Sequence, residues 1–271
     1  MAEPSFNAII TSKDNQYVKL VRSLADKKQR KAAGLFLAEG LANIREALVS
    51  VMQPELLLYA EGAQSRPEVD RLLQQAAEKG ARVLAVRPDL LKSSSQTENS
   101  QGLLLALRLP QLTTADFLTR VQGSNLAILD GLQDPGNIGT ILRTAWAAGL
   151  GGVLLVNDCA DVFSPKVVRA AMGALYHLPV LALPDTEAEQ LLNQLDCELV
   201  CADAAGRDFR RCQFTRPVAW LLGKEATGPS AFWRGRASCL AAIPMQAGVN
   251  SLNVAVAAGI LFFSLQSDTT K

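Results

Sequence analysis

The stretches LLGKEATGP (Leu221–Pro229) and IPMQAGVNSLNVAVAAGI (Ile243–Ile260), with the earlier DPGNIGTILR (Asp134–Arg143), decide the fold of this 271-residue chain. Each contains a loop rich in Gly, Asn or Pro that follows a short apolar run, NLAILD, PVAWLL or LAAIP. These runs predict buried strands. Since ligands bind outside the carboxyl ends of strands in an open parallel sheet, we expect the three loops to converge on one small molecule. The absence of GxGxxG and of a P-loop sequence disfavours a dinucleotide or nucleotide-phosphate site.

In this order the three stretches resemble the signature of the SpoU/TrmH-type RNA ribose 2′-O-methyltransferases, class IV methyltransferases of the SPOUT superfamily. The matching patterns are NxGxxxR (Asn137, Gly139, Arg143), LLGxExxG (Gly223, Glu225, Gly228) and IPM…NSLNV (Ile243 to Val254). The resemblance is strong from about residue 126 to 265. It implies a C-terminal α/β domain with a parallel sheet and a deep trefoil knot, a topology that periodicity alone would never reveal. It also implies S-adenosyl-L-methionine as methyl donor, an RNA substrate and a homodimer.

The chain has material for two cores, since 49% of its residues are hydrophobic. Helix-like and strand-like stretches alternate before residue 110, which predicts a small α/β domain. This part resembles, more weakly, the substrate-binding domain often attached to the family. We therefore expect an RNA substrate-binding domain over residues 1–109, a linker over 110–123 and the SPOUT catalytic domain over 124–271.

The resemblance also assigns roles to individual residues. Arg143 either assists deprotonation of the ribose hydroxyl or positions the RNA, and we favour positioning because a guanidinium stays protonated well above neutral pH. The catalytic residues that the resemblance implies are Arg143, Asn137, Glu225, Ser251 and Asn253. The residues that it implies for cofactor binding are Gly223, Ile243, Leu252, Met245, Gly248 and Asn253.

Local patterns add further expectations. We expect Asn137 to cap the helix that follows it, so that Gly139 and Arg143 share one face that glycine leaves open. Ser251 reads as the cap of the last apolar helix. Glu225 either organises its loop through backbone N–H groups or reaches the substrate. Trp146 either stacks on a base or packs within the protein.

The charge distribution points to phosphate binding more than the total charge does. The net charge is only +1, but residues 13–31 hold seven basic side chains against two acidic ones. Such a basic segment either binds RNA phosphates or forms a solvated helix face, and the three loops favour RNA binding. The expected RNA-binding residues are Lys13, Lys19, Arg22, Lys27, Lys28, Arg30 and Lys31, together with Arg143.

Several classes of site and location are disfavoured by the composition. Five cysteines without a CxxC pair and a single histidine, His177, predict reduced thiols and no metal site, and they argue against nucleophilic triads. The longest uncharged apolar run is too short to span a bilayer, and MAEPSFNAII shows no leader pattern. We therefore expect a cytoplasmic protein without a membrane partner.

The sequence fits three functional classes to different degrees. The leading interpretation is S-adenosylmethionine-dependent ribose 2′-O-methylation, with large-subunit ribosomal RNA favoured over transfer RNA because of the two-domain layout and the DPGN loop. A noncatalytic RNA-binding or ribosome-assembly protein with the same fold stays open, although the intact NxGxxxR and NSLN patterns argue for catalysis. The third class, a nicotinamide-dependent oxidoreductase, is disfavoured because this chain lacks the glycines that bind the phosphates of such a cofactor.

Overall fold

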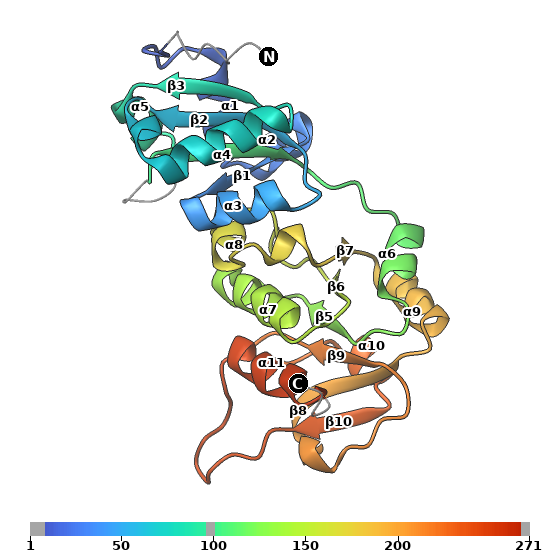
Figure 1. Ribbon diagram of the computed structural model, residues 1–271. Helices are drawn as coiled ribbons and strands as arrows, with labels where there is room; N and C mark the ends of the chain where they lie inside the picture. Colours follow the sequence, from blue (N-terminus) through green and yellow to red (C-terminus); the bar gives the residue numbers. More distant parts are fainter. Residues whose placement is uncertain (1–8, 96–100, 267–271) are drawn as a thin grey trace. The chain divides into compact units, whose positions relative to one another are not determined.

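The computed structural model describes residues 9–95 and 101–266, which form two compact units (Figure 1). The first unit comprises Met1–Gln111 and Asp161–Tyr176, and the second comprises Leu112–Ala160 and His177–Lys271. Residues 1–8, which include most of the stretch from which we inferred the absence of a leader, lie outside the described residues. Within the described residues, no helix is both long and apolar enough to cross a membrane.

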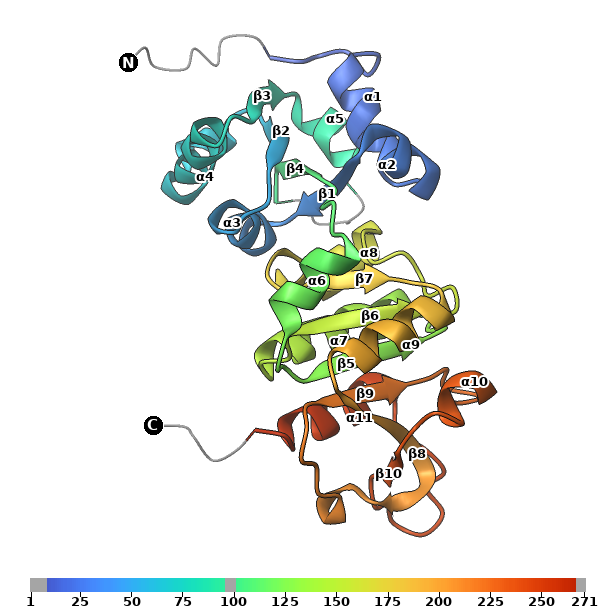
Figure 2. The same cartoon turned by 90° about the vertical axis from the view of Figure 1, so that its right-hand side faces the viewer.

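The first unit is built on a mixed four-stranded sheet with strand order β1-β4-β2-β3. β4 runs opposite to the other three strands, so β2 and β3 are the one neighbouring pair in this sheet that is parallel. Helices α1 and α5 cover one face and α3 and α4 the other, as Figure 2 shows. The elements are α1 (Gln16–Ser23), α2 (Lys27–Ala33), β1 (Leu35–Glu39), α3 (Leu41–Val49), β2 (Pro54–Ala60), η1 (Ala63–Ser65), α4 (Pro67–Glu78), β3 (Arg82–Val86), α5 (Pro88–Lys92) and β4 (Leu103–Arg108).

A later segment, Asp161–Tyr176, also belongs to this unit and contains α8 (Pro165–Ala170) and η2 (Ala174–Tyr176). The Phe163 ring lies 5.0 Å from that of Phe36, and the Tyr176 hydroxyl donates to Asn43 Oδ1 over 2.8 Å. We expected residues 124–271 to form one domain. The contacts of this segment group it with the first unit instead, because its aromatic side chains pack on β1 and α3.

The second unit is a six-stranded, entirely parallel sheet with strand order β10-β8-β9-β5-β6-β7. One face packs against α6, α9 and α10, and the other against α7 and α11. The strands and helices expected from the apolar runs are present. Their bounds are α6 (Thr114–Val121), β5 (Leu126–Asp130), α7 (Pro135–Ala147), β6 (Gly152–Val156), β7 (Val180–Ala182), α9 (Asp185–Gln194), β8 (Glu198–Asp208), η3 (Phe209–Arg211), β9 (Val218–Leu222), α10 (Ala231–Arg234), β10 (Cys239–Ala242) and α11 (Val254–Phe263).

The segment that we interpreted as a linker, residues 110–123, contains helix α6. Thr113 and Asp116 form a capping box in which each side chain accepts from the other residue's backbone N–H. Phe117 and Val121 are fully buried in the core of the second unit. The polar turn residues of this stretch are therefore a helix start, and its apolar residues are part of the core.

Two helix starts differ from the sequence-based expectation. Helix α7 begins at Pro135 and is capped by Asp134, whose Oδ1 accepts from Asn137 N over 2.8 Å. Helix α11 begins at Val254 and is capped by Asn253, not by Ser251. Proline fits the first helical position, which moves the start of α7 three residues earlier. The side chain of Asn137 is consequently free of capping and available to the site.

Candidate active site

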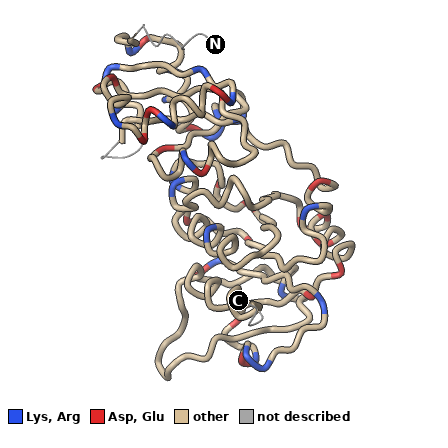
Figure 3. The backbone as a smooth tube through the Cα atoms, in the orientation of Figure 1, with Lys and Arg blue, Asp and Glu red and all other residues tan. Residues whose placement is uncertain are grey.

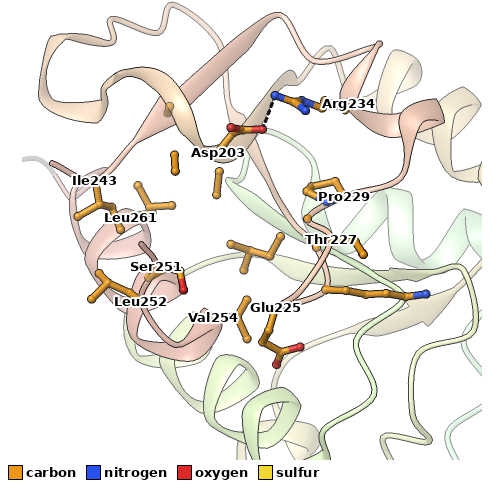
Figure 4. A pocket seen from close by; sticks show the side chains of 18 of the residues that line it. Asp203, Glu225, Thr227, Pro229, Arg234, Ile243, Ser251, Leu252, Val254 and Leu261 are labelled. Atoms are coloured by element: carbon orange, nitrogen blue, oxygen red, sulfur yellow. Dashed lines mark ion pairs between the residues drawn. The ribbon is translucent and has the colours of Figure 1, made fainter. Parts of the chain in front are cut away.

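A cavity of about 370 Å³ opens at the carboxyl ends of β9 and β10 (Figure 4). Because the strands are parallel, the chain leaves both at the same edge of the sheet. Ile243, Leu252 and Leu261 form an apolar wall, and Thr227 and Pro229 lie across from them. The full lining is Ala202, Asp203, Ala204, Leu222, Gly223, Lys224, Glu225, Thr227, Gly228, Pro229, Arg234, Ala241, Ile243, Met245, Ser251, Leu252, Val254, Ala257 and Leu261.

The loop after β9 closes on itself at Gly223. Gly228 N donates to Lys224 O over 2.8 Å, and these two residues form an isolated antiparallel bridge. A Cβ on Gly223 would lie 2.0 Å from Pro229 N, so no residue with a side chain fits there without moving the backbone. Glycine therefore allows the neck of the loop to close, which presents backbone groups to the cavity.

Side-chain hydrogen bonds join the three loops at the rim of this cavity. Asn137 Nδ2 donates to Glu225 Oε1 over 2.5 Å, and Asn253 Nδ2 donates to Asn137 Oδ1 over 2.9 Å. Asn253 Oδ1 accepts from the backbone N–H groups of Ala255 and Val256, the first turn of α11. The predicted convergence of the loops thus occurs through one chain of hydrogen bonds.

The groups at the two ends of this series of hydrogen bonds determine which way each amide faces. An ionised Glu225 only accepts, so Asn137 must turn its amide NH2 toward it and its oxygen toward Asn253. The helix N–H groups only donate, so Asn253 must turn its oxygen toward them and its NH2 toward Asn137. Both constraints give the same orientation of the two amides. No single member can be replaced by a group of opposite polarity without breaking a bond.

A buried carboxylate, Asp130, holds the loop that follows β9, and we did not predict this residue from the sequence. Asp130 ends β5 and is 2% exposed. Its Oδ2 accepts from Ser230 N over 2.6 Å, and its Oδ1 accepts from Asn157 Nδ2 over 2.8 Å. An acidic residue at the end of an otherwise apolar strand was the available signal. Asp130 anchors the far end of the loop that begins at Gly223.

Replacing this anchor should destabilise the fold. We expect Asp130→Ala to lower the free energy of unfolding by about 1–3 kcal/mol, because the Ser230 N–H and the Asn157 amide lose hydrogen bonds to a buried, charged acceptor. Urea denaturation would show a lower midpoint with an unchanged slope. Glu187→Ala on α9, which removes an exposed carboxylate, is the matched control. Equal midpoints for the two variants would contradict the anchoring role of Asp130.

A second carboxylate that we did not predict is Asp203, which lines the cavity. Its Oδ2 lies 2.8 Å from Arg234 NH2, and its Oδ1 accepts from Ala205 N. The pair is marked by the dashed line in Figure 4. Asp203 lies where the ladder between β8 and β10 is interrupted after Cys201. This interruption turns the backbone of Ala202–Ala204 toward the cavity, and no loop pattern in the sequence signals it.

The structure brings many, not all, of the expected site residues together. Gly223, Ile243, Met245, Leu252, Glu225 and Ser251 line the cavity, whereas Gly248 does not. Asn137 and Asn253 reach its rim through Glu225. Arg143 is exposed on α7 and does not line the cavity. Gly139 is buried, so the expectation that it leaves an open face beside Arg143 is wrong.

The basic residues between positions 13 and 31 do not behave alike. Arg30 is 3% exposed, donates to the carbonyls of Leu24 and Ala25 and pairs with Asp161 over 2.6 Å. It holds the first unit together, so its prediction as an RNA-binding residue is wrong. Lys19 pairs with Asp14, and Arg22 donates to the hydroxyls of Ser93 and Ser94. Lys13, Lys27, Lys28 and Lys31 are exposed.

Trp146 stacks on His177. Of the two alternatives for Trp146, stacking on a base or packing within the protein, the structure shows packing within the protein. The ring centroids lie 4.7 Å apart with an angle of 4° between the planes. Trp146 still has 38% of its surface exposed. The histidine therefore packs against an aromatic ring.

Two family models match the chain. The SpoU rRNA Methylase family model matches residues 124–263, and the MRM3-like substrate binding domain model matches residues 15–105. The first match contains all three loops of the site. The second lies within the first unit.

Individual proteins match over nearly the whole chain. The 23S rRNA (guanosine(2553)-2′-O)-methyltransferase of Bacillus subtilis is 30% identical over 95% of this chain and 98% of that protein. The 23S rRNA (uridine(2479)-2′-O)-methyltransferase of Streptomyces viridochromogenes is 31% identical over 94% of this chain and 90% of that protein. The crystal structure of an AdoMet-bound rRNA methyltransferase from Sinorhizobium meliloti superposes with a TM-score of 0.85, at 30% identity, over 96% of this chain and 99% of that chain.

Proposed function

Because the chain belongs to the SpoU rRNA methylase family, we propose that it transfers a methyl group from S-adenosylmethionine to a ribose 2′-oxygen of large-subunit ribosomal RNA. The resemblance drawn from the three loops is confirmed by the family match. The observation that carries the proposal is the joining of all three loops beside one cavity by the Glu225, Asn137 and Asn253 side chains. The deep trefoil knot stays a prediction from the family.

The cavity residues suit S-adenosylmethionine. The cavity volume of about 370 Å³ falls in the range of small-molecule sites. Ile243, Leu252 and Leu261 offer an apolar wall for an adenine ring, and the closed neck at Gly223 offers backbone donors and acceptors. When bound, this cofactor supplies an electrophilic methyl group on a sulfonium. No change in oxidation state of a protein group is needed for the transfer.

The residues of the chain would act by holding the reactants in line and excluding water. The amide chain from Glu225 to α11 fixes the loops that flank the cavity. Ser251 lines the cavity, and its hydroxyl would contact the incoming ribose. Arg143 would hold an RNA phosphate through its planar donors, because a guanidinium that stays charged cannot serve as a base. The hydroxyl proton would pass to an oxygen of the substrate phosphate.

Transfer of labelled methyl from S-adenosylmethionine to RNA transcripts tests the reaction. We expect label on a ribose 2′-oxygen of 23S rRNA fragments and none on transfer RNA. Nuclease digestion to nucleosides would locate the methyl group. Label only on transfer RNA would overturn the substrate assignment. A protein that binds RNA but neither binds nor uses S-adenosylmethionine would instead be the noncatalytic ribosome-assembly protein.

The first unit is proposed to bind RNA through the exposed lysines of α2. Basic positions are interspersed with acidic ones along the chain (Figure 3), which favours a local contact over a broad basic surface. Lys28 and Lys31 are exposed on α2, a helix that Asp26 caps. The match of residues 15–105 to a substrate-binding domain supports this role.

Charge reversal on α2 should weaken RNA binding. We expect Lys28→Glu with Lys31→Glu to reduce RNA affinity about tenfold and to lower the salt dependence of binding, because each lost phosphate contact releases one counterion fewer. Filter binding at several salt concentrations measures both. Arg71→Glu, on α4 across the sheet, is the control. Identical salt slopes for wild type and the double variant would refute this assignment.

A homodimer is proposed to form through helix α11. Val256, Ile260 and Phe263 are 53%, 36% and 47% exposed, at the i, i+4 and i+7 spacing of one helix face. An exposed apolar stripe of this kind is typical of a protein interface. A twofold dimer would bring two such stripes together.

Placing a charge in this stripe should separate the subunits. We expect Ile260→Lys to sediment as a monomer at concentrations where the wild type is a dimer, because a buried unpaired ammonium is strongly unfavourable. Val51→Lys, at an 89% exposed apolar position of the first unit, is the control. A wild-type protein that sediments as a monomer would exclude the dimer.

The proposed location of the enzyme is the cytoplasm, because ribosomal RNA is the proposed substrate.

A further inference from the structure

Two thiols lie together beside the sheet of the second unit. Cys212 follows the turn η3, and Cys239 is the first residue of β10. Their Sγ atoms are 3.6 Å apart. A disulfide bond is about 2.05 Å long, so the sulfurs need to approach by only about 1.5 Å to bond. Both side chains are partly exposed, which gives a small oxidant access.

A cation accompanies this pair. Arg207 Nε donates to Cys212 Sγ over 3.3 Å. Burial raises the pKa of the Cys212 thiol, and the hydrogen bond from Arg207 opposes that rise. A guanidinium next to a thiol favours the thiolate, which is the form that attacks an oxidant. Of the two thiols, Cys212 accepts this hydrogen bond, which favours attack from its sulfur, and Cys239 lies close enough to resolve the product.

The strand that begins at Cys239 leads into the cavity. Ala241 of β10 and the following Ile243 both line it. The backbones of β10 and β8 are in close contact, since a Cβ on Gly206 would lie 2.5 Å from the carbonyl carbon of Leu240. Strand β10 cannot relax toward β8 at that point. A displacement of Cys239 on bonding would therefore move the strand that carries Ala241 and leads to Ile243.

We infer that Cys212 and Cys239 form a reversible disulfide on exposure to hydrogen peroxide, and that this bond weakens S-adenosylmethionine binding in the cavity. The second half of this inference rests on the proposed function. The Cys212 thiolate attacks one peroxide oxygen and becomes a sulfenic acid, and the other oxygen leaves as water after protonation. The Cys239 thiol then displaces the sulfenic oxygen, which leaves as a second water while the S–S bond forms. Both sulfurs are oxidised and the peroxide is reduced.

Peptide mapping of the full-length protein tests the bond itself. After peroxide treatment and alkylation, we expect a peptide pair linked through Cys212 and Cys239 that disappears with dithiothreitol. Cys212→Ser and Cys239→Ser should each abolish it, so a folding defect in one variant leaves the other informative. Cys197→Ser is the matched control, because Cys197 is also partly exposed, and burial raises its pKa to about 11. Alkylation of both thiols after oxidation, or a sulfinic acid at Cys212, would overturn the inference.

Calorimetry of S-adenosylmethionine binding tests the coupling. We expect the oxidised wild type and oxidised Cys197→Ser to bind about tenfold more weakly than their reduced forms, and Cys212→Ser to be unaffected by peroxide. Linkage requires the reciprocal effect, so saturating S-adenosylmethionine must make the disulfide harder to form by the same factor. A mapped disulfide with unchanged affinity would refute the coupling. If the reduced protein does not bind S-adenosylmethionine while the disulfide still maps, the proposed function fails and the oxidation site stands.

Discussion

Arg143→Ala is expected to reduce kcat/KM for methyl transfer by about 10²–10³ while leaving S-adenosylmethionine affinity unchanged. The magnitude follows from the loss of the donors that hold the substrate phosphate, since a misplacement of about 1 Å at a reacting centre can cost 10²-fold in rate. The affinity should not move, because Arg143 is exposed on α7 and does not line the cavity. Single-turnover rates with 23S rRNA fragments and calorimetry with the cofactor measure the two quantities separately.

Arg143→Lys sharpens this test. Lysine retains the charge but not the planar donor pair, so a positioning role predicts partial activity between wild type and Arg143→Ala. Added guanidinium should restore part of the rate of the alanine variant. Unchanged turnover in Arg143→Ala would refute the assignment. A parallel loss of cofactor affinity would show that Arg143 acts through the fold of the cavity instead.

Asn253→Asp is expected to lower the rate of methyl transfer about 100-fold without lowering stability. The carboxylate keeps the acceptor that caps α11 and adds a negative charge that a helix N-terminus favours. It cannot donate to Asn137 Oδ1, so two acceptors face each other and the loops separate. Displacements of about 1 Å at a reacting centre can cost 10²-fold in rate.

Asn253→Ala separates capping from bridging. Alanine removes both functions, so we expect a similar loss of rate together with a destabilisation of about 1 kcal/mol from the lost cap. Urea denaturation and single-turnover rates measure the two effects. Full activity in Asn253→Asp would show that the amide chain is incidental. A large fall in its stability would mean that the lost rate reports unfolding.

The helix caps illustrate how near the sequence reasoning came to the site. Both Asp134 and Asn137 are residue types that cap helices, and both precede the same apolar pattern. Only the folded loop shows that Asp134 takes the cap and leaves Asn137 to join Glu225 and Asn253. The partners of Asn137 lie 88 and 116 positions away along the chain. Local preferences contain no information about such partners.

The sequence by itself determined the strands, the three loops beyond them, the cavity residues Gly223, Ile243 and Leu252, and the family. The strands and loops depend on local patterns, because glycine, caps and apolar runs act within a few residues. The cavity residues and the family came from the resemblance of the loops to the SpoU/TrmH signature. Tertiary structure alone decided that Arg30 is buried against Asp161, that α6 belongs to a core and that Asp130 anchors a loop through Ser230. Burial and pairing at these positions depend on residues distant in the chain, and charge or polarity alone does not reveal which side chains water will reach.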